Sequence, residues 1–316
     1  MNTGICLRKH ELFYGFVQII ASIKKAFYET MPVLELTLKT PGIKVKIYIS
    51  ICTILLNSYC FFIFANNWNS IYYPAAPRLE LSYVLEKSSM TEEDYTLLLH
   101  QTGLGRAAVD QLLQQPAGRA EIITFQEGYY AKTKSFREKL NLFTSQENLL
   151  PADSPGSGTM QLAPLKPGDI ILTKSTSTLF WRHGHCGMVL DPAKGVTLES
   201  LEPGTLSMKQ SLSKWLSYPT FKIMRLKNAD ESTLAELVKY AENKLTDIKY
   251  SILASKTTCN TTPASSNCSQ LIWQAFRHSG YDLDSNKGLL VTPEDIAKSP
   301  LLETVQVRGF NPDEPW

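Results

Sequence analysis

The chain has 316 residues, of which 43% are hydrophobic and 20% charged, a composition typical of a globular protein with one or two cores. Its formal net charge is only +2, and no run of basic residues is interleaved with aromatic ones, which argues against nucleic acid as a partner. The six cysteines are too thinly spread for a disulfide framework, although a bridge between Cys259 and Cys268 is conceivable in an oxidising compartment.

The N-terminal region contains an uncharged, apolar stretch from Ile47 to Ala65 that is about as long as a bilayer core requires. Three lysines shortly precede it and the next basic residue is Arg78, so the positive-inside rule predicts a cytoplasmic N-terminus and an exported remainder. We expect residues 1–44 to be a cytoplasmic extension and 45–66 a transmembrane anchor or signal segment. If translation starts at Met31, a signal peptide is the alternative, and a buried core helix is the third interpretation.

Residues 78–150 are predicted to form a helical spacer or accessory region. Thr91 and the acidic residues that follow it are typical of a helix start, and Gly103 is typical of a helix end. Further helices are expected from Arg106 to Gln115 and from Ile122 to Leu142. Residues 151–163 begin with Pro, Asp, Ser and Gly, a composition that predicts a linker and a domain boundary.

The hydrophobic pattern changes after this linker, in residues 164–316. Short strands are expected first, at Ile170–Thr173, His185–Leu190, Val196–Ser200 and Thr220–Leu226. Two helices follow, one from Ser232 to Leu245 and one from Cys268 to His278. Because strands and helices occur in separate blocks, we expect an α+β domain and not a doubly wound parallel sheet.

Cys268 is the first candidate for chemistry, because it falls in the first turn of a predicted helix. Ser265, Ser266 and Asn267 are all good N-cap residues, and a helix N-terminus favours a thiolate. The unpaired N–H groups of the same turn can stabilise the oxyanion of an attacked carbonyl. The alternative is a buried cysteine that packs as a small hydrophobic side chain.

His185 is the candidate proton carrier, and His183 is its rival if the strand starts earlier. The two histidines also suggest a metal, but no third and fourth ligands stand at a recognisable spacing, so we expect neither a metal nor another cofactor. Glu199, at the end of the next strand, can orient the imidazole through its second ring nitrogen. Glu202 is the alternative for that role, and a solvated surface acid is the third interpretation for both glutamates.

Five segments of the C-terminal part follow one another in a characteristic order: LKPGDIIL from Leu165, GHCGMV from Gly184, LES from Leu198, Lys249-Tyr250 and NCSQL from Asn267. This order resembles the circularly permuted branch of the NlpC/P60 papain-like cysteine hydrolases, in particular the YiiX/YebB-like group, in which the histidine strand also precedes the cysteine helix. The resemblance covers about Leu165 to Ile296. It implies that residues 164–316 form a permuted papain-like catalytic domain with a small antiparallel sheet packed on the nucleophile helix.

Carried over residue by residue, the resemblance implies that Cys268 is the nucleophile, His185 the general base and later acid, and Glu199 the residue that orients the histidine. Tyr250 would line the site or assist the oxyanion, with simple core packing as the alternative. Cys186 departs from the pattern, because relatives more often have an aliphatic residue there. We expect its side chain to point away from the face of His185 and to pack as a small hydrophobic group.

The implied reaction is acyl transfer from an amide or ester to Cys268 and then to water or another acceptor. For a membrane-anchored or secreted enzyme, the expected substrate is an amide of a peptidoglycan stem peptide. The alternative is a lipid acyl group, as in lecithin:retinol acyltransferase-like enzymes, for which Leu179-Phe180-Trp181 would form an apolar lip. The third possibility is a non-catalytic binding domain, in which Cys268 would be buried or bridged to Cys259.

Overall fold

The computed structural model describes residues 48–60, 71–141, 144–150, 160–178, 182–256 and 263–316. It divides the chain into two compact units, Met1–Phe64 and Ala65–Trp316. The described part of the first unit is a helix over residues 48–60, and residues 45–47 and 61–66 of the expected anchor lie outside the described residues. Within the described ranges no helix has both the length and the apolar character needed to cross a membrane. The expected anchor at 45–66 is therefore not supported.

The centre of the second unit is a six-stranded sheet in the order β11-β8-β3-β5-β6-β7, with antiparallel pairing between all neighbours. The α+β prediction is confirmed by this sheet and the helices beside it. The four predicted strands are present as β3 (Ile170–Thr173), β5 (His185–Asp191), β6 (Val196–Glu199) and β8 (Phe221–Leu226). Two strands were not predicted, β7 (Met208–Ser211) and β11 (Leu302–Arg308).

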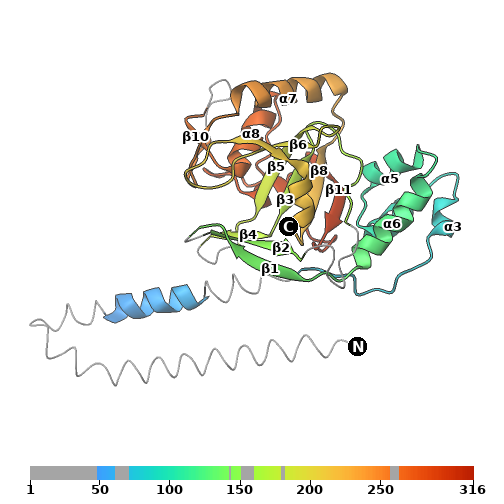
Figure 1. Ribbon diagram of the computed structural model, residues 1–316, viewed down its shortest axis with the longest axis horizontal. Coiled ribbons are helices and arrows are strands. Elements are labelled where there is room, and N and C mark those ends of the chain that lie inside the picture. The colour runs from blue at the N-terminus through green and yellow to red at the C-terminus, as the bar shows by residue number, and fades with distance from the viewer. Residues whose placement is uncertain (1–47, 61–70, 142–143, 151–159, 179–181, 257–262) are drawn as a thin grey trace, which may run out of the picture. The chain divides into compact units, whose positions relative to one another are not determined.

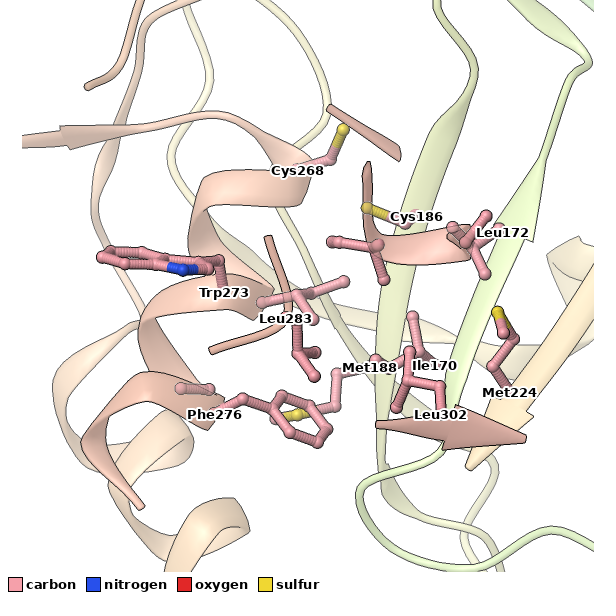
Figure 2. Close-up of a cluster of buried hydrophobic side chains, with 14 of the residues drawn as sticks. Ile170, Leu172, Cys186, Met188, Met224, Cys268, Trp273, Phe276, Leu283 and Leu302 are labelled. Carbon is pink, nitrogen blue, oxygen red and sulfur yellow. The ribbon is translucent and has the colours of Figure 1, made fainter. Parts of the chain in front are cut away.

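The first face of this sheet is covered by α7 (Glu231–Lys244) and α8 (Cys268–His278), as Figure 1 shows. Strand side chains alternate between the faces, so Ile170 and Leu172 join this core while Ile171 points to the other side. In Figure 2, Trp273 and Phe276 of α8 pack among the sheet side chains of the same cluster. The short helix α9 (Pro293–Ala297) and the two-residue strands β9 (Lys249–Tyr250) and β10 (Ser265–Ser266) complete this side.

The opposite face of the sheet packs against the helices of residues 78–150. These are α3 (Ser82–Leu85), α4 (Glu92–Thr102), α5 (Arg106–Leu113) and α6 (Gly118–Tyr130). Their buried side chains share a second core with Ile171 and Val305 of the sheet, and α5 and α6 lie next to β11 in Figure 1. Thr91 caps α4 in a capping box and Gly103 ends it at φ 72°, as expected. The helical region is thus part of the same compact unit and not a separate accessory module.

A second sheet includes residues in which the third helix was expected to continue. The structure ends α6 at Tyr130 and forms a three-stranded sheet in the order β1-β2-β4, from β1 (Ser135–Lys139), β2 (Thr144–Leu149) and β4 (Thr176–Thr178). The prediction of a helix to Leu142 was therefore wrong. Ala131 leaves α6 in an extended conformation, and the residues after it pair with β2 across the register Phe136 to Asn148. Most of the expected linker, residues 151–159, lies outside the described residues.

Candidate active site

Cys268 is the first residue of α8, and the sequence around it fixes that position. Asn267 is the N-cap, and its side-chain oxygen accepts a hydrogen bond from the Gln270 N–H at 2.9 Å. The apolar face of α8 anchors the helix in the core through side chains such as Leu271 and Ile272. Cys268 is a free thiol with 7% of its surface exposed, and it lines a cavity. The thiol is therefore held at a helix N-terminus with access from one side.

His185 begins β5, and two glycines make room around it. Gly184 has φ 74°, and a Cβ there would lie 2.7 Å from the Thr173 carbonyl oxygen. A Cβ at Gly187 would lie 2.8 Å from Trp215 and 2.9 Å from the Glu199 side chain. The imidazole stacks on the Trp215 ring, with centroids 5.5 Å apart. The small residues of this motif thus allow an indole and a carboxylate to sit against the histidine.

Glu199 is the partner of the histidine, as the alternation along β6 suggested. His185 Nε2 donates to Glu199 Oε2 at 2.7 Å, and the carboxylate is fully buried. Because Nε2 is engaged in this way, Nδ1 is the ring nitrogen left to interact with the Cys268 thiol, which lines the same cavity. The pKa of each of these two groups is shifted by the other. The structure therefore brings Cys268, His185 and Glu199 together at one site.

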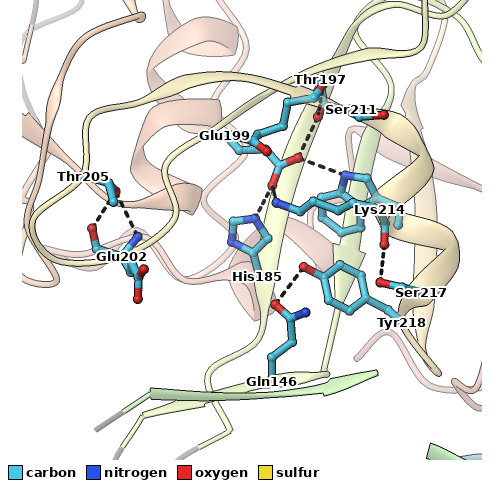
Figure 3. A network of polar contacts seen from close by, with 12 residues as sticks. Gln146, His185, Thr197, Glu199, Glu202, Thr205, Ser211, Lys214, Ser217 and Tyr218 are labelled. Carbon is cyan, nitrogen blue, oxygen red and sulfur yellow. Dashed lines mark hydrogen bonds and ion pairs between the residues drawn. The ribbon is translucent and has the colours of Figure 1, made fainter. Parts of the chain in front are cut away.

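Three further side chains hold the Glu199 carboxylate (Figure 3). Thr197 Oγ1 donates to Oε1 at 2.6 Å, Trp215 Nε1 donates to Oε1 at 3.1 Å, and Lys214 Nζ lies 2.5 Å from Oε2. Sequence reasoning missed all three. Thr197 could have been found, since it is two residues before Glu199 on the same strand face. Lys214 and Trp215 come from the 3₁₀ helix η1 (Leu212–Ser217), whose contact with β6 is a tertiary feature with no local signal.

The electrostatics favour a thiolate paired with an imidazolium. The pKa of Cys268 is lowered well below its usual value by a hydrogen bond from the Cys186 thiol and, against the effect of burial, by the hydrogen bond and charge of His185. Burial lowers the pKa of His185, but hydrogen bonds that the imidazolium donates to the Cys268 thiolate and to Glu199 outweigh burial and raise the pKa above its usual value. Glu199 stays ionised because His185 and Lys214 bring its pKa to about 2 in spite of burial.

Cys186 does more than the expected packing. It is buried in the first core with Cys268, and both sulfur atoms are drawn in Figure 2. Its own pKa is raised well above the usual value, first by burial and then by its interaction with Cys268, so it stays a thiol. The protonated Cys186 thiol is therefore a candidate hydrogen-bond donor to the candidate nucleophile, whose pKa it lowers.

Removing this donor should raise the pKa of Cys268. A hydrogen bond to a charged group contributes about 1.5–3 kcal/mol, so in Cys186→Ala we expect the alkylation of Cys268 by iodoacetamide to shift upward by about one to two pH units. Cys186→Ser keeps a donor of similar size and should shift the profile less. Equal profiles for the wild type and Cys186→Ala would show that the Cys186 thiol does not stabilise the thiolate.

The cavity at this site has a volume of about 600 Å³ and is lined by Cys268, His185, His183, Tyr250 and side chains from all three strands of the second sheet. Tyr250 thus lines the site, one of the two interpretations given for it. His183 also lies in the cavity, but its Nε2 bonds Thr178 Oγ1 at 2.9 Å and its Nδ1 bonds the Gly184 carbonyl at 2.6 Å. Both histidines lower the pKa of Cys268, and the influence of His185 is the larger of the two.

Other interpretations of the sequence concerned Glu202, a metal ion, the apolar lip and Cys259. Glu202 lines the cavity and accepts from Asn141 Nδ2 at 2.7 Å, whereas the ring nitrogen of His185 bonds Glu199. In the part of the chain that the structure describes, no group of three or more His, Cys, Asp or Glu side chains could hold a metal ion. The apolar lip at 179–181 and Cys259 lie outside the described residues.

Together, the fold and the site define an α+β protein with a cysteine–histidine–glutamate arrangement at one end of an antiparallel sheet. Among curated proteins, the chain is similar to the uncharacterized protein YycO of Bacillus subtilis, with 29% identity over 151 residues. This match covers 47% of the chain and spans about three-fifths (59%) of the length of YycO. No family model matches the sequence, so membership of the permuted NlpC/P60 branch stays a prediction.

Among solved structures, the chain is similar to the metalloprotein YiiX from Escherichia coli O157:H7. The TM-score is 0.37 at 16% identity, and the match covers 45% of this chain and 97% of YiiX. A score at this level does not establish a shared fold.

Proposed function

We propose that this protein is a cysteine hydrolase that forms an acyl-enzyme on Cys268. The observation that carries the proposal is the position of His185, which is hydrogen-bonded through Nε2 to the buried Glu199 and lines the same cavity as the Cys268 thiol, whose pKa it lowers. A thiolate at a helix N-terminus, a proton carrier and a group that orients this carrier are the parts needed for nucleophilic acyl transfer.

The proposed reaction has two steps. The Cys268 thiolate attacks the carbonyl carbon of an amide or ester, and the His185 imidazolium gives its proton to the departing amine or alcohol as the carbonyl–heteroatom bond breaks. Neutral His185 then takes a proton from water, whose oxygen attacks the thioester and releases a carboxylic acid and the thiol group of Cys268. The first turn of α8 offers backbone N–H groups to the oxyanion, and the neutral Tyr250 hydroxyl in the same cavity is a further candidate donor.

The first substrate class that we propose is an amide in a peptidoglycan stem peptide, as the sequence resemblance implies for an extracytoplasmic enzyme. Support comes from the polar wall of the cavity. Apart from Leu149, the side chains of β2 and β4 that line it are hydrogen-bonding and uncharged: Thr144, Gln146, Asn148, Thr176 and Thr178. Such a wall suits the amide groups of an extended peptide.

A second substrate class, a lipid acyl group, is favoured by the rest of the lining. Apolar side chains occupy much of the remaining wall and the rim: Phe136, Leu140, Leu149, Leu201, Pro203 and Ile252. Phe136, Leu140 and Ile252 are also solvent-exposed, a position in which large apolar side chains are often used for binding. An acyl chain could be buried along this side while its carbonyl reaches Cys268.

The test is hydrolysis of both substrate classes by the purified full-length protein. Muropeptides and acyl esters or amides of increasing chain length are incubated with the wild type and with Cys268→Ala, and the products and any thioester on Cys268 are read by mass spectrometry. We expect turnover of one class, lost in Cys268→Ala. If neither class reacts and Cys268 of the wild type stays unreactive toward iodoacetamide, the non-catalytic binding domain becomes the better interpretation.

A further inference from the structure

Lys214 shares one carboxylate oxygen with the candidate catalytic histidine. Its Nζ lies 2.5 Å from Glu199 Oε2, and His185 Nε2 lies 2.7 Å from the same atom (Figure 3). The side chain of Lys214 is only 25% exposed and lines the cavity. The nitrogen of a lysine and a ring nitrogen of the histidine that exchanges a proton in the proposed reaction therefore meet at a single oxygen.

We propose that Lys214 is a positioning residue of this site, and that its ammonium group sets the pH range in which His185 holds a proton by competing for the charge of Glu199. This role rests on the proposed use of Cys268 as the nucleophile. Lys214 acts through Glu199 and His185 and takes no proton from the substrate.

The positive charge of Lys214 should lower the pKa of His185. With Lys214 present, Glu199 is already paired, and the imidazolium of His185 forms beside another cation, so protonation of His185 is less favourable than next to the carboxylate alone. The Cys268 thiolate lies on the other side of the imidazole and is attracted to Lys214 over a longer distance. Removal of the lysine charge should therefore raise the pKa of His185 strongly and that of Cys268 only slightly.

Other titratable groups around His185 do not supply the same effect. From the elements packed against it come the following groups: Cys268 of α8, Cys186 of β5, His183 before β5, Tyr218 after η1 and Tyr250 of β9. Burial raises the pKa of both tyrosines and of Cys186, so these stay neutral, and burial lowers the pKa of His183. Among the described residues, Lys214 is the lysine that forms an ion pair with Glu199.

The position of the carboxylate does not require the charge of Lys214. Thr197 and Trp215 hold Oε1 from the other side, and His185 itself holds Oε2. A variant with an uncharged donor at position 214 should therefore keep the arrangement and change only its electrostatics. Such a variant separates an effect on the pKa of His185 from a general effect on folding.

The experiment measures the alkylation of Cys268 by iodoacetamide in the full-length protein from pH 4 to 10, with mass-spectrometric readout. The thiolate forms in a first step, and its reactivity rises again in a second step when His185 loses its proton. In Lys214→Gln we expect the second step to move up by about one to three pH units and the first step to move much less. Lys214→Arg should restore the wild-type profile. The control is Lys209→Gln, because Lys209 is exposed and pairs with Glu242 away from the site.

The proposal is overturned if Lys214→Gln and Lys209→Gln give the same second step, or if Lys214→Arg behaves like Lys214→Gln. Should Lys214→Gln fail to fold, Lys214→Met, which keeps an unbranched side chain without the charge, takes its place, and the second step must again rise relative to the wild type. Failure of the proposed function has a different signature, since Cys268 of the wild type itself would then lack the low-pH step.

Discussion

Replacing His185 by alanine should slow the alkylation of Cys268 by iodoacetamide roughly 10- to 100-fold at pH 6. In the wild type the thiolate is stabilised by the imidazolium, so it should react well below the pH range of an ordinary thiol. Without the imidazole, the thiolate fraction falls toward that of a free cysteine, although the higher basicity of the remaining thiolate offsets part of the loss. Turnover of any substrate should fall by about 10²–10⁴-fold, the usual contribution of a positioned acid and base.

The matched control is His183→Ala, two residues away and facing the same cavity. The charge of His183 is the smallest of the influences that lower the pKa of Cys268, so this variant should keep most of the low-pH reactivity. Identical profiles for the wild type and His185→Ala would contradict the proposed thiolate–imidazolium pair. A Cys268 that reacts only after denaturation would exclude the cysteine hydrolase altogether.

The sequence was most informative where local patterns determine the geometry. The N-cap residues before Cys268 placed the thiol in the first turn of a helix, and the structure has α8 over the predicted residues. Strand alternation placed Glu199 on a face that can meet His185, and the two side chains are hydrogen-bonded. These elements could be predicted because helix starts and strand faces depend on residues near one another in the chain.

The parts that could not be predicted depend on contacts between distant segments. Lys214 reaches Glu199 only because η1 follows β7, a short strand with the polar sequence Met-Lys-Gln-Ser that alternation does not distinguish from a loop. Cys186 and Cys268 come together only through the packing of α8 on the sheet.

The sheet β1-β2-β4 was missed for a related reason. Residues 135–139 contain Arg, Glu and Lys, which are good helix formers, and become a strand because β2 pairs with them. β4 is a three-residue strand whose partner lies about thirty residues earlier. The strands that form one wall of the cavity therefore have no local sequence signal, and the sequence alone does not distinguish the two substrate classes.

Glu199 should make a large, pH-dependent contribution to the free energy of unfolding. Its pKa falls from an ordinary 4.5 to about 2 in the folded protein, which corresponds to about 3 kcal/mol. Because the folded pKa is the lower one, this stabilisation is complete above pH 4.5 and is lost as the pH falls from there toward 2. In Glu199→Gln the stabilisation is absent and Lys214 loses its buried counter-charge, so we expect a loss of about 3–5 kcal/mol at neutral pH.

The measurement is urea unfolding of the wild type and of Glu199→Gln between pH 2 and 7, followed by far-UV circular dichroism. The difference in unfolding free energy between them should shrink by about 3 kcal/mol as the pH falls from about 5 toward 2. Glu202→Gln is the control, because Glu202 lies three residues later and its carboxylate accepts a hydrogen bond from the exposed Asn141, so its effect should stay within about 0.5 kcal/mol. If the wild type and Glu199→Gln instead give parallel curves down to pH 2, Glu199 is not held ionised by His185 and Lys214. The site would then lack the fixed negative charge on which the orientation of the histidine depends.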